Sequence, residues 1–146
     1  MTPTLYGRWQ TRFILLITVG VLITLFFGWL FQDYVTTLSI LAYVLVIGFG
    51  WDILYQFLQT FRWDEDWPVV FQVFTGLAEA ILIWILIKFV PWEVFGQTQL
   101  PGVNPNITFL QFFYHYFTVW LAVLLCTQGP LRIIFPRWRF FGGQWL

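Results

Sequence analysis

The sequence predicts an all-α, polytopic membrane protein whose four transmembrane helices form an antiparallel bundle with both termini in the cytoplasm. Composition is the first observation: 60% of the residues are hydrophobic and 10% are charged, whereas soluble domains have about 25% charged residues. The second is a charge-free run of membrane-spanning length from Phe13 to Gln32, followed by three more apolar runs. None of these runs has the apolar/polar alternation of a β-barrel strand. Residues 1–146 are therefore expected to form a single transmembrane domain.

The spans are placed by the apolar runs and by turn signals, at residues 13–31, 35–61, 68–90 and 108–127. Only Gln32 to Tyr34 separate the first two, so these helices must be antiparallel neighbours. A longer loop from Pro91 to Pro105 precedes the fourth span, which Thr108 and Gln111 are expected to begin with a capping box. The remaining residues, 128–146, are predicted to form a tail at the membrane interface.

Orientation follows from the positions of the basic residues. They precede the first span, lie between the second and third, and follow the fourth, and with four spans these segments share one side of the membrane. Lys88 alone lies near the other side. Both termini are therefore expected in the cytoplasm, and the net charge of zero argues against binding to nucleic acid.

Asp52, Glu79 and His115 are ionisable residues inside predicted spans, where a charge costs about 2.5–3.5 kcal/mol on insertion scales. At a rise of about 1.5 Å per residue they lie roughly 14, 16 and 18 Å from the cytoplasmic ends of their helices. Other polar residues follow at helical spacing on the same faces. We name the whole set the polar seam, and its members are Asp52, Tyr55, Gln72, Glu79, Gln111 and His115.

Three interpretations of the polar seam are open. It can be an interhelical hydrogen-bond network that specifies packing. It can be a proton or ion relay, or a ligand pocket, for which buried carboxylates are suited. It can also be buried against another subunit.

His115 is the single histidine, and an imidazole among aromatic residues can ligate the metal of a porphyrin or chlorin. A core histidine with satisfied hydrogen bonds is the competing interpretation. One histidine excludes bis-histidine haem within the chain, and one cysteine, Cys126, excludes a multi-cysteine metal site. We therefore expect no metal and no cofactor, with chlorophyll or a carotenoid as the alternative.

Basic and aromatic residues flank the spans at the cytoplasmic side, where arginines contact anionic headgroups and rings lie at the acyl boundary. We expect them to dock on lipid or on a partner protein. They are Arg8, Arg12, Arg132, Arg137, Trp138 and Arg139.

Two segments, residues 61–68 (FRWDEDWP) and 129–146 (GPLRIIFPRWRFFGGQWL), resemble small uncharacterised four-span membrane proteins of photosynthetic bacteria. The resemblance implies no activity. It implies a photosynthetic membrane as the location, so the expected site is a bacterial inner membrane or a thylakoid membrane.

The function predicted from the sequence is a non-catalytic accessory or structural subunit of a larger membrane complex, because so small a bundle has more surface than interior. The first alternative is a small oligomeric channel or proton-coupled transporter that uses the polar seam. The second is a pigment-binding subunit of a photosynthetic complex, with His115 as ligand. No nucleophile with an adjacent base is visible, so no enzyme is expected. The expected partners are the lipid bilayer and other membrane subunits or further copies of the chain.

Overall fold

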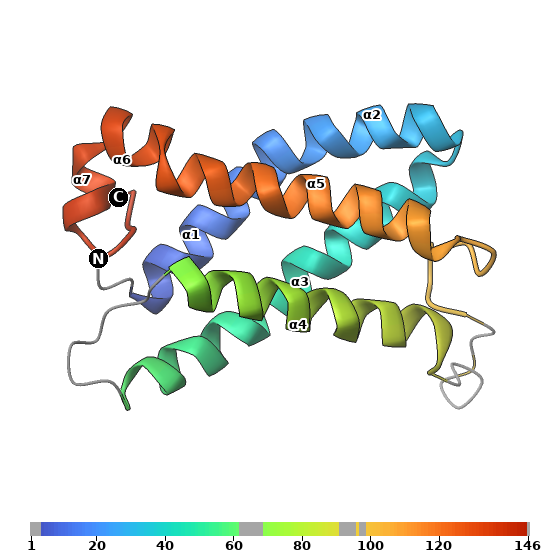
Figure 1. The fold of residues 1–146 in the computed structure, drawn as a ribbon, viewed down its shortest axis with the longest axis horizontal. Helices are drawn as coiled ribbons and strands as arrows, with labels where there is room; N and C mark the ends of the chain where they lie inside the picture. The colour runs from blue at the N-terminus through green and yellow to red at the C-terminus, as the bar shows by residue number, and fades with distance from the viewer. Residues whose placement is uncertain (1–3, 62–68, 91–95, 97–98, 146) are drawn as a thin grey trace.

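The fold is a bundle of four long helices (Figure 1). The structure, a computed structural model, describes residues 4–61, 69–90, 96 and 99–145, with the side chain of Arg139 excepted. Four helical segments are long and apolar enough to cross a membrane, namely Leu5–Phe31, Tyr34–Gln59, Val69–Lys88 and Phe109–Ile134. The predicted all-α class and the four spans are confirmed, and the protein is a multi-pass membrane protein by the length and composition of its helices.

The first span consists of three consecutive elements, α1 (Leu5–Leu15), the π-helical turn η1 (Leu16–Gly20) and α2 (Val21–Phe31). It begins well before the predicted start at Phe13, because the Thr4 side chain caps the helix by accepting a hydrogen bond from the Gly7 N–H. Arg8 and Arg12 are therefore helical residues rather than part of a preceding segment.

The other spans are α3 (Tyr34–Gln59), α4 (Val69–Lys88) and α5 (Phe109–Gln128), and two short helices follow, α6 (Pro130–Ile134) and α7 (Pro136–Phe140). The predicted capping box of Thr108 and Gln111 is confirmed at the start of α5. The predicted start of the third span at Pro68 and most of the resembling segment 61–68 lie outside the described residues. We call the end of the bundle at Thr4 and Gly142, which are hydrogen-bonded to each other, the terminal end.

The predicted turn between the first two spans is confirmed, and it needs only two residues. Gln32 has the left-handed conformation, with φ 54°, and ends α2. Asp33 then begins α3, accepting hydrogen bonds from the Thr36 N–H at 3.0 Å and the Thr36 hydroxyl at 2.6 Å. These hydrogen bonds lower the pKa of Asp33 from its ordinary value of 3.8, and the bond from the Thr36 hydroxyl has the largest effect.

Asp33→Ala is expected to destabilise the protein by about 1 kcal/mol at neutral pH, because α3 loses its cap. The lowered pKa of Asp33 means that this stabilisation is complete above about pH 4 and is lost as the pH falls through the lowered value. Unfolding in detergent, followed against pH, should show the wild type and the variant converging in acid. A difference between the two that does not change with pH would contradict the role of the carboxylate.

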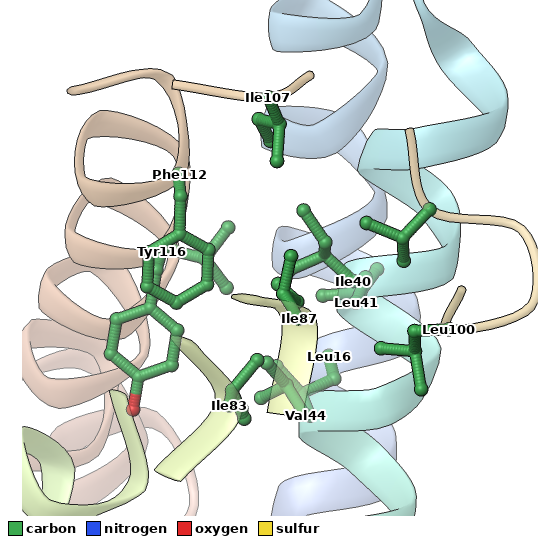
Figure 2. Close-up of a cluster of buried hydrophobic side chains, with 12 residues drawn as sticks. Leu16, Ile40, Leu41, Val44, Ile83, Ile87, Leu100, Ile107, Phe112 and Tyr116 are labelled. Carbon is green, nitrogen blue, oxygen red and sulfur yellow. The ribbon is translucent and has the colours of Figure 1, made fainter. Parts of the chain in front are cut away.

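The core lies between α3, α4, α5 and the first span. Figure 2 shows ring side chains of α5 facing aliphatic side chains of α3 and α4, and the buried cluster includes Ile40, Leu41, Val44, Ile83, Ile87, Phe112 and Tyr116. Gly20 of η1 and Gly28 of α2 let the first span approach α3 closely, since a Cβ at Gly20 would press on Leu41 and one at Gly28 on Tyr34. Many large apolar side chains on the outer faces are exposed, such as Leu22, Val46, Phe74 and Leu110, which suggests contact with the lipid bilayer.

The C-terminal segment packs back onto α1 at the terminal end, which corrects the prediction for Trp138. Its side chain is 4% exposed, and its Nε1–H donates to the Thr11 hydroxyl at 2.7 Å. That hydroxyl donates in turn to the Gly143 carbonyl at 3.1 Å. Trp138 therefore contacts the protein's own first helix rather than lipid, because the indole N–H finds a buried partner there. Arg137 is exposed, and the side chain of Arg139 lies outside the described residues.

Candidate functional site

Three helices bring three charged side chains together inside the bundle. Arg12 of α1 donates from Nε to Asp52 Oδ2 at 2.9 Å and from Nη2 to Asp52 Oδ1 at 3.1 Å, which is a bidentate pair with α3. Its Nη1 donates to Glu79 Oε1 of α4 at 3.2 Å. Both carboxylate side chains are 6% exposed and the arginine side chain is 19% exposed. We call these three residues the charged cluster.

Gly48 makes the space for the guanidinium group. It lies one helical turn before Asp52 on α3, and a Cβ built at this position would collide with Nη1, Cζ and Nε of Arg12. Only glycine lets the planar group lie flat against the backbone of α3 while it reaches the carboxylate of the next turn. The step of four residues from Gly48 to Asp52 is therefore the local sequence feature that positions the charged cluster.

The charged cluster is asymmetric. Asp52 holds two nitrogens of Arg12 in parallel, whereas Glu79 shares the remaining one, with its second oxygen at 3.5 Å. One arginine cannot neutralise two carboxylates, so the three residues carry one negative charge when both acids are ionised. Glu79 has the weaker contact, and it is the carboxylate that can take up a proton with the smaller loss of hydrogen bonding.

The charged cluster faces a cavity of about 210 Å³. At about 30 Å³ per molecule this volume holds about seven waters, and it is smaller than the roughly 300–1,000 Å³ typical of pockets for drug-sized ligands. Arg8, Gln128 and Arg132 line it at the terminal end, and His115 and Ile40 line it deep in the bundle. The space therefore suits water, an ion or a very small solute. We call it the first cavity.

Tyrosine and glutamine side chains hold α4 against its neighbours around the first cavity. The Tyr55 hydroxyl donates to the Thr75 carbonyl at 3.3 Å, and the Tyr116 hydroxyl donates to the Gly76 carbonyl at 2.8 Å. Gln128 Nε2 donates to Gln72 Oε1 at 2.8 Å. The structure therefore brings five members of the polar seam to one cavity, namely Asp52, Tyr55, Gln72, Glu79 and His115, and polar side chains around it join α3, α4 and α5.

Two members of the polar seam, Gln111 and His115, lie on α5. Gln111 is occupied by the capping box at the helix start, where its Oε1 accepts from the Thr108 N–H at 3.0 Å. His115 lines the deep end of the first cavity and is 2% exposed. Its Nε2 lies 2.9 Å from the hydroxyl of Thr24 on α2, and its Nδ1 has no hydrogen-bond partner among the described residues. The predicted pigment ligand is thus enclosed between helices, which leaves a chlorophyll in the lipid no access to the ring.

The π-helical turn η1 allows Arg12 and Thr24 to face the same interior. In an unbroken α-helix, with about 100° per residue, side chains twelve positions apart point about 120° away from each other. The π-helical turn contains one residue more than an α-helical turn, as the hydrogen bond from the Val21 N–H to the Leu16 carbonyl shows. The angle between the directions of the Arg12 and Thr24 side chains therefore falls from about 120° to about 20°. The first span can therefore present a charge at one depth and a hydroxyl at another to the same bundle interior.

The prediction that Arg12 docks on lipid or a partner is wrong, because its guanidinium group lies inside the bundle. The prediction is wrong in part for Arg8 and Arg132. All three were expected at lipid or a partner, but they line the first cavity, and Arg8 donates from Nη2 to Gln59 Oε1 at 2.9 Å. One signal could have located Arg12. Two acids inside spans require a nearby cation, and Arg12 is the basic residue that directly precedes the first apolar run.

Among the residues that the structure describes, no group of three His, Cys, Asp or Glu side chains could hold a metal ion. Comparison with known proteins found no matching family model, no matching curated protein and no matching solved structure. The resemblance to proteins of photosynthetic bacteria stays a prediction. The charged cluster and its cavity are therefore the features of the molecule that point to a function.

Proposed function

We propose that the protein is a small proton-coupled transport protein in which Glu79 takes up and releases the proton. The observation that carries the proposal is a single one: Arg12 is shared between two buried carboxylates that line a cavity of about 210 Å³. Ionisable residues inside membrane spans are expensive, and they commonly line ion pathways and proton relays.

A purely structural role accounts less well for the charged cluster. Buried ion pairs can often be replaced by apolar residues of similar volume without loss of stability, or with a gain. Three charges inside an apolar bundle are therefore a costly way to join helices that already pack through an aliphatic and aromatic core. A function that uses these charges would explain why the protein bears the free-energy cost of burying them.

The proposed step begins with a proton that enters the first cavity through water. It binds to a carboxylate oxygen of Glu79, which then no longer attracts Nη1 of Arg12, while the bidentate pair with Asp52 stays in place. Release of the proton restores the contact between Arg12 and Glu79. This exchange changes how α4 is held to α1, which provides a means of coupling proton binding to movement of α4.

We further propose that the terminal end faces the cytoplasm. Arg8, Arg12, Arg132 and Arg137 belong to segments at this end, whereas Lys88 is the last residue of α4 at the opposite end. An excess of arginine on one side is the usual mark of the cytoplasmic face. Protons would then reach Glu79 from the cytoplasm.

The test is proton flux into proteoliposomes that contain a pH-sensitive dye, driven by a potassium diffusion potential. The wild type is expected to carry flux, and Glu79→Gln, which keeps the shape and a hydrogen-bonding oxygen but cannot titrate, is expected to reduce it to the background of empty liposomes. Glu79→Asp is the matched control, because it keeps the carboxylate and should retain partial flux. Wild-type flux in Glu79→Gln would remove Glu79 from the mechanism.

The accessory-subunit function stays a prediction, because lipid and a partner protein cover exposed apolar helix faces equally well. Its measurement is separate from the flux assay. Purification of the tagged protein from native membranes in mild detergent, followed by mass spectrometry, would show stoichiometric partner subunits if it is correct, and a homo-oligomer alone would favour transport.

A further inference from the structure

A second polar cavity lies at the opposite end of the bundle from the termini. It measures about 290 Å³, and Asp33, Thr37, Asn104 and Gln111 are among the residues that line it. We call it the second cavity. The first cavity reaches the terminal end and the second reaches the other end, so a cavity enters the bundle from each side.

The two cavities end one helical turn apart. On α3 the second cavity is lined as far as Thr37 and the first begins at Ile40 and Leu41. On α5 the corresponding residues are Gln111 and His115. Three or four residues at about 1.5 Å each leave a layer of about 4.5–6 Å between the cavities.

The first span places Thr24 at the height of this layer. A Cβ at Gly20 would touch the Leu41 side chain, and a Cβ at Gly28 would touch the Thr37 hydroxyl. Thr24 lies halfway between these two glycines along the first span, so it is level with the segment of α3 that separates the cavities. The layer is tightly packed, since the most completely buried side chains of the protein include Thr24, Thr37, Ile40, Phe112 and His115.

His115 is the titratable group in this layer. Asp52 and Glu79 lie on the side of the first cavity and Asp33 lies on the side of the second. One imidazole nitrogen is bonded to the Thr24 hydroxyl, and the other is buried with no hydrogen-bond partner among the described residues. An imidazole can accept a proton at one nitrogen while it gives up a proton from the other, which is the property that a relay across a thin layer requires.

We propose that the His115–Thr24 pair is the barrier between the two cavities and that His115 passes the proton across it. The proposal rests on the proposed proton-coupled function. A proton from water in the first cavity forms an N–H bond at Nδ1, and the N–H bond at Nε2 then breaks as its proton moves to the Thr24 oxygen. The Thr24 hydroxyl releases its own proton toward the second cavity. Rotation of the hydroxyl and exchange of the imidazole tautomer restore the starting state, so protons balance over the cycle.

The experiment uses the full chain in the same proteoliposomes. His115→Gln removes the titratable ring but can still bond to Thr24, and it is expected to lower proton flux about tenfold or more. Thr24→Val keeps the shape and removes the hydroxyl, and it should also lower flux. Tyr114→Phe is the matched control, because Tyr114 is the neighbouring residue and is exposed on the outside of α5, and its flux should equal that of the wild type.

Chemical rescue separates proton transfer from a merely structural role. His115→Ala leaves a space the size of the ring, and added imidazole is expected to restore flux in this variant and to leave Glu79→Gln inactive. Wild-type flux that persists in both His115→Gln and Thr24→Val would overturn the relay and leave the role of Glu79 intact. Rescue failing in a folded His115→Ala would overturn it as well. A wild type without any flux would instead refute the proposed function itself, together with the relay.

Discussion

Arg12→Gln is expected to destabilise the protein by about 3–5 kcal/mol, the cost of removing one partner from a buried ion pair. The variant removes the guanidinium group that bridges Asp52 and Glu79, so both buried carboxylates lose their charged hydrogen-bond partner. Thermal unfolding in detergent measures the loss. Arg137→Gln is the matched control, because Arg137 is exposed and its removal should change the midpoint very little.

A triple variant tests whether the charged cluster serves function rather than folding. Arg12→Met, Asp52→Leu and Glu79→Leu together remove all three charges and replace them with apolar volume, which in buried ion pairs is neutral or stabilising by about 1–4 kcal/mol. We expect this variant to recover the stability lost in Arg12→Gln and to carry no proton flux. A triple variant as unstable as Arg12→Gln would mean that the charges are required for assembly of the bundle.

Gly48→Ala is expected to have the second largest effect, although it alters no charge. The added methyl group collides with the guanidinium group of Arg12, and overpacking of this kind costs about 1–3 kcal/mol. Arg12 must shift away from α3, so its bidentate geometry with Asp52 is lost and proton flux should fall with stability.

Gly50→Ala is the control for Gly48→Ala, two residues farther along the same helix. A Cβ at Gly50 meets nothing within 4 Å, and replacing a helical glycine with alanine normally stabilises a helix by about 0.5–1 kcal/mol. The two variants should therefore change the unfolding midpoint in opposite directions. Equal effects in both would show that the guanidinium group does not rely on the space at Gly48.

The elements of the fold could be predicted from the sequence because lipid imposes simple rules. Long apolar runs located four spans, and the short turn at Gln32 and Asp33 and the capping box at Thr108 follow from local hydrogen bonding. The burial of Asp52, Glu79 and His115 also follows, since a charge in a span seeks the interior.

The charged cluster itself could not be predicted by the same rules. A span defined by its charge-free run starts after Arg12, yet the helix starts at Leu5, because Thr4 caps it and because the guanidinium group has partners inside the bundle. Helical spacing placed Gln111 and His115 on one face, but it does not reveal that a cavity boundary lies between them. Trp138 looked like an interfacial residue, and only the tertiary contact with Thr11 shows that it is buried.

The wide sequence separation within the charged cluster has a consequence for biosynthesis. Arg12 precedes Asp52 by 40 residues and Glu79 by 67, so the arginine is synthesised before either of the acids that it contacts. During that interval the long side chain can reach the headgroups at the terminal end of the helix. Its contacts inside the bundle need the second span for Asp52 and the third for Glu79, and the contact of Trp138 with Thr11 needs a segment that is made later still. The buried position of Arg12 therefore depends on segments of the chain that are made after it.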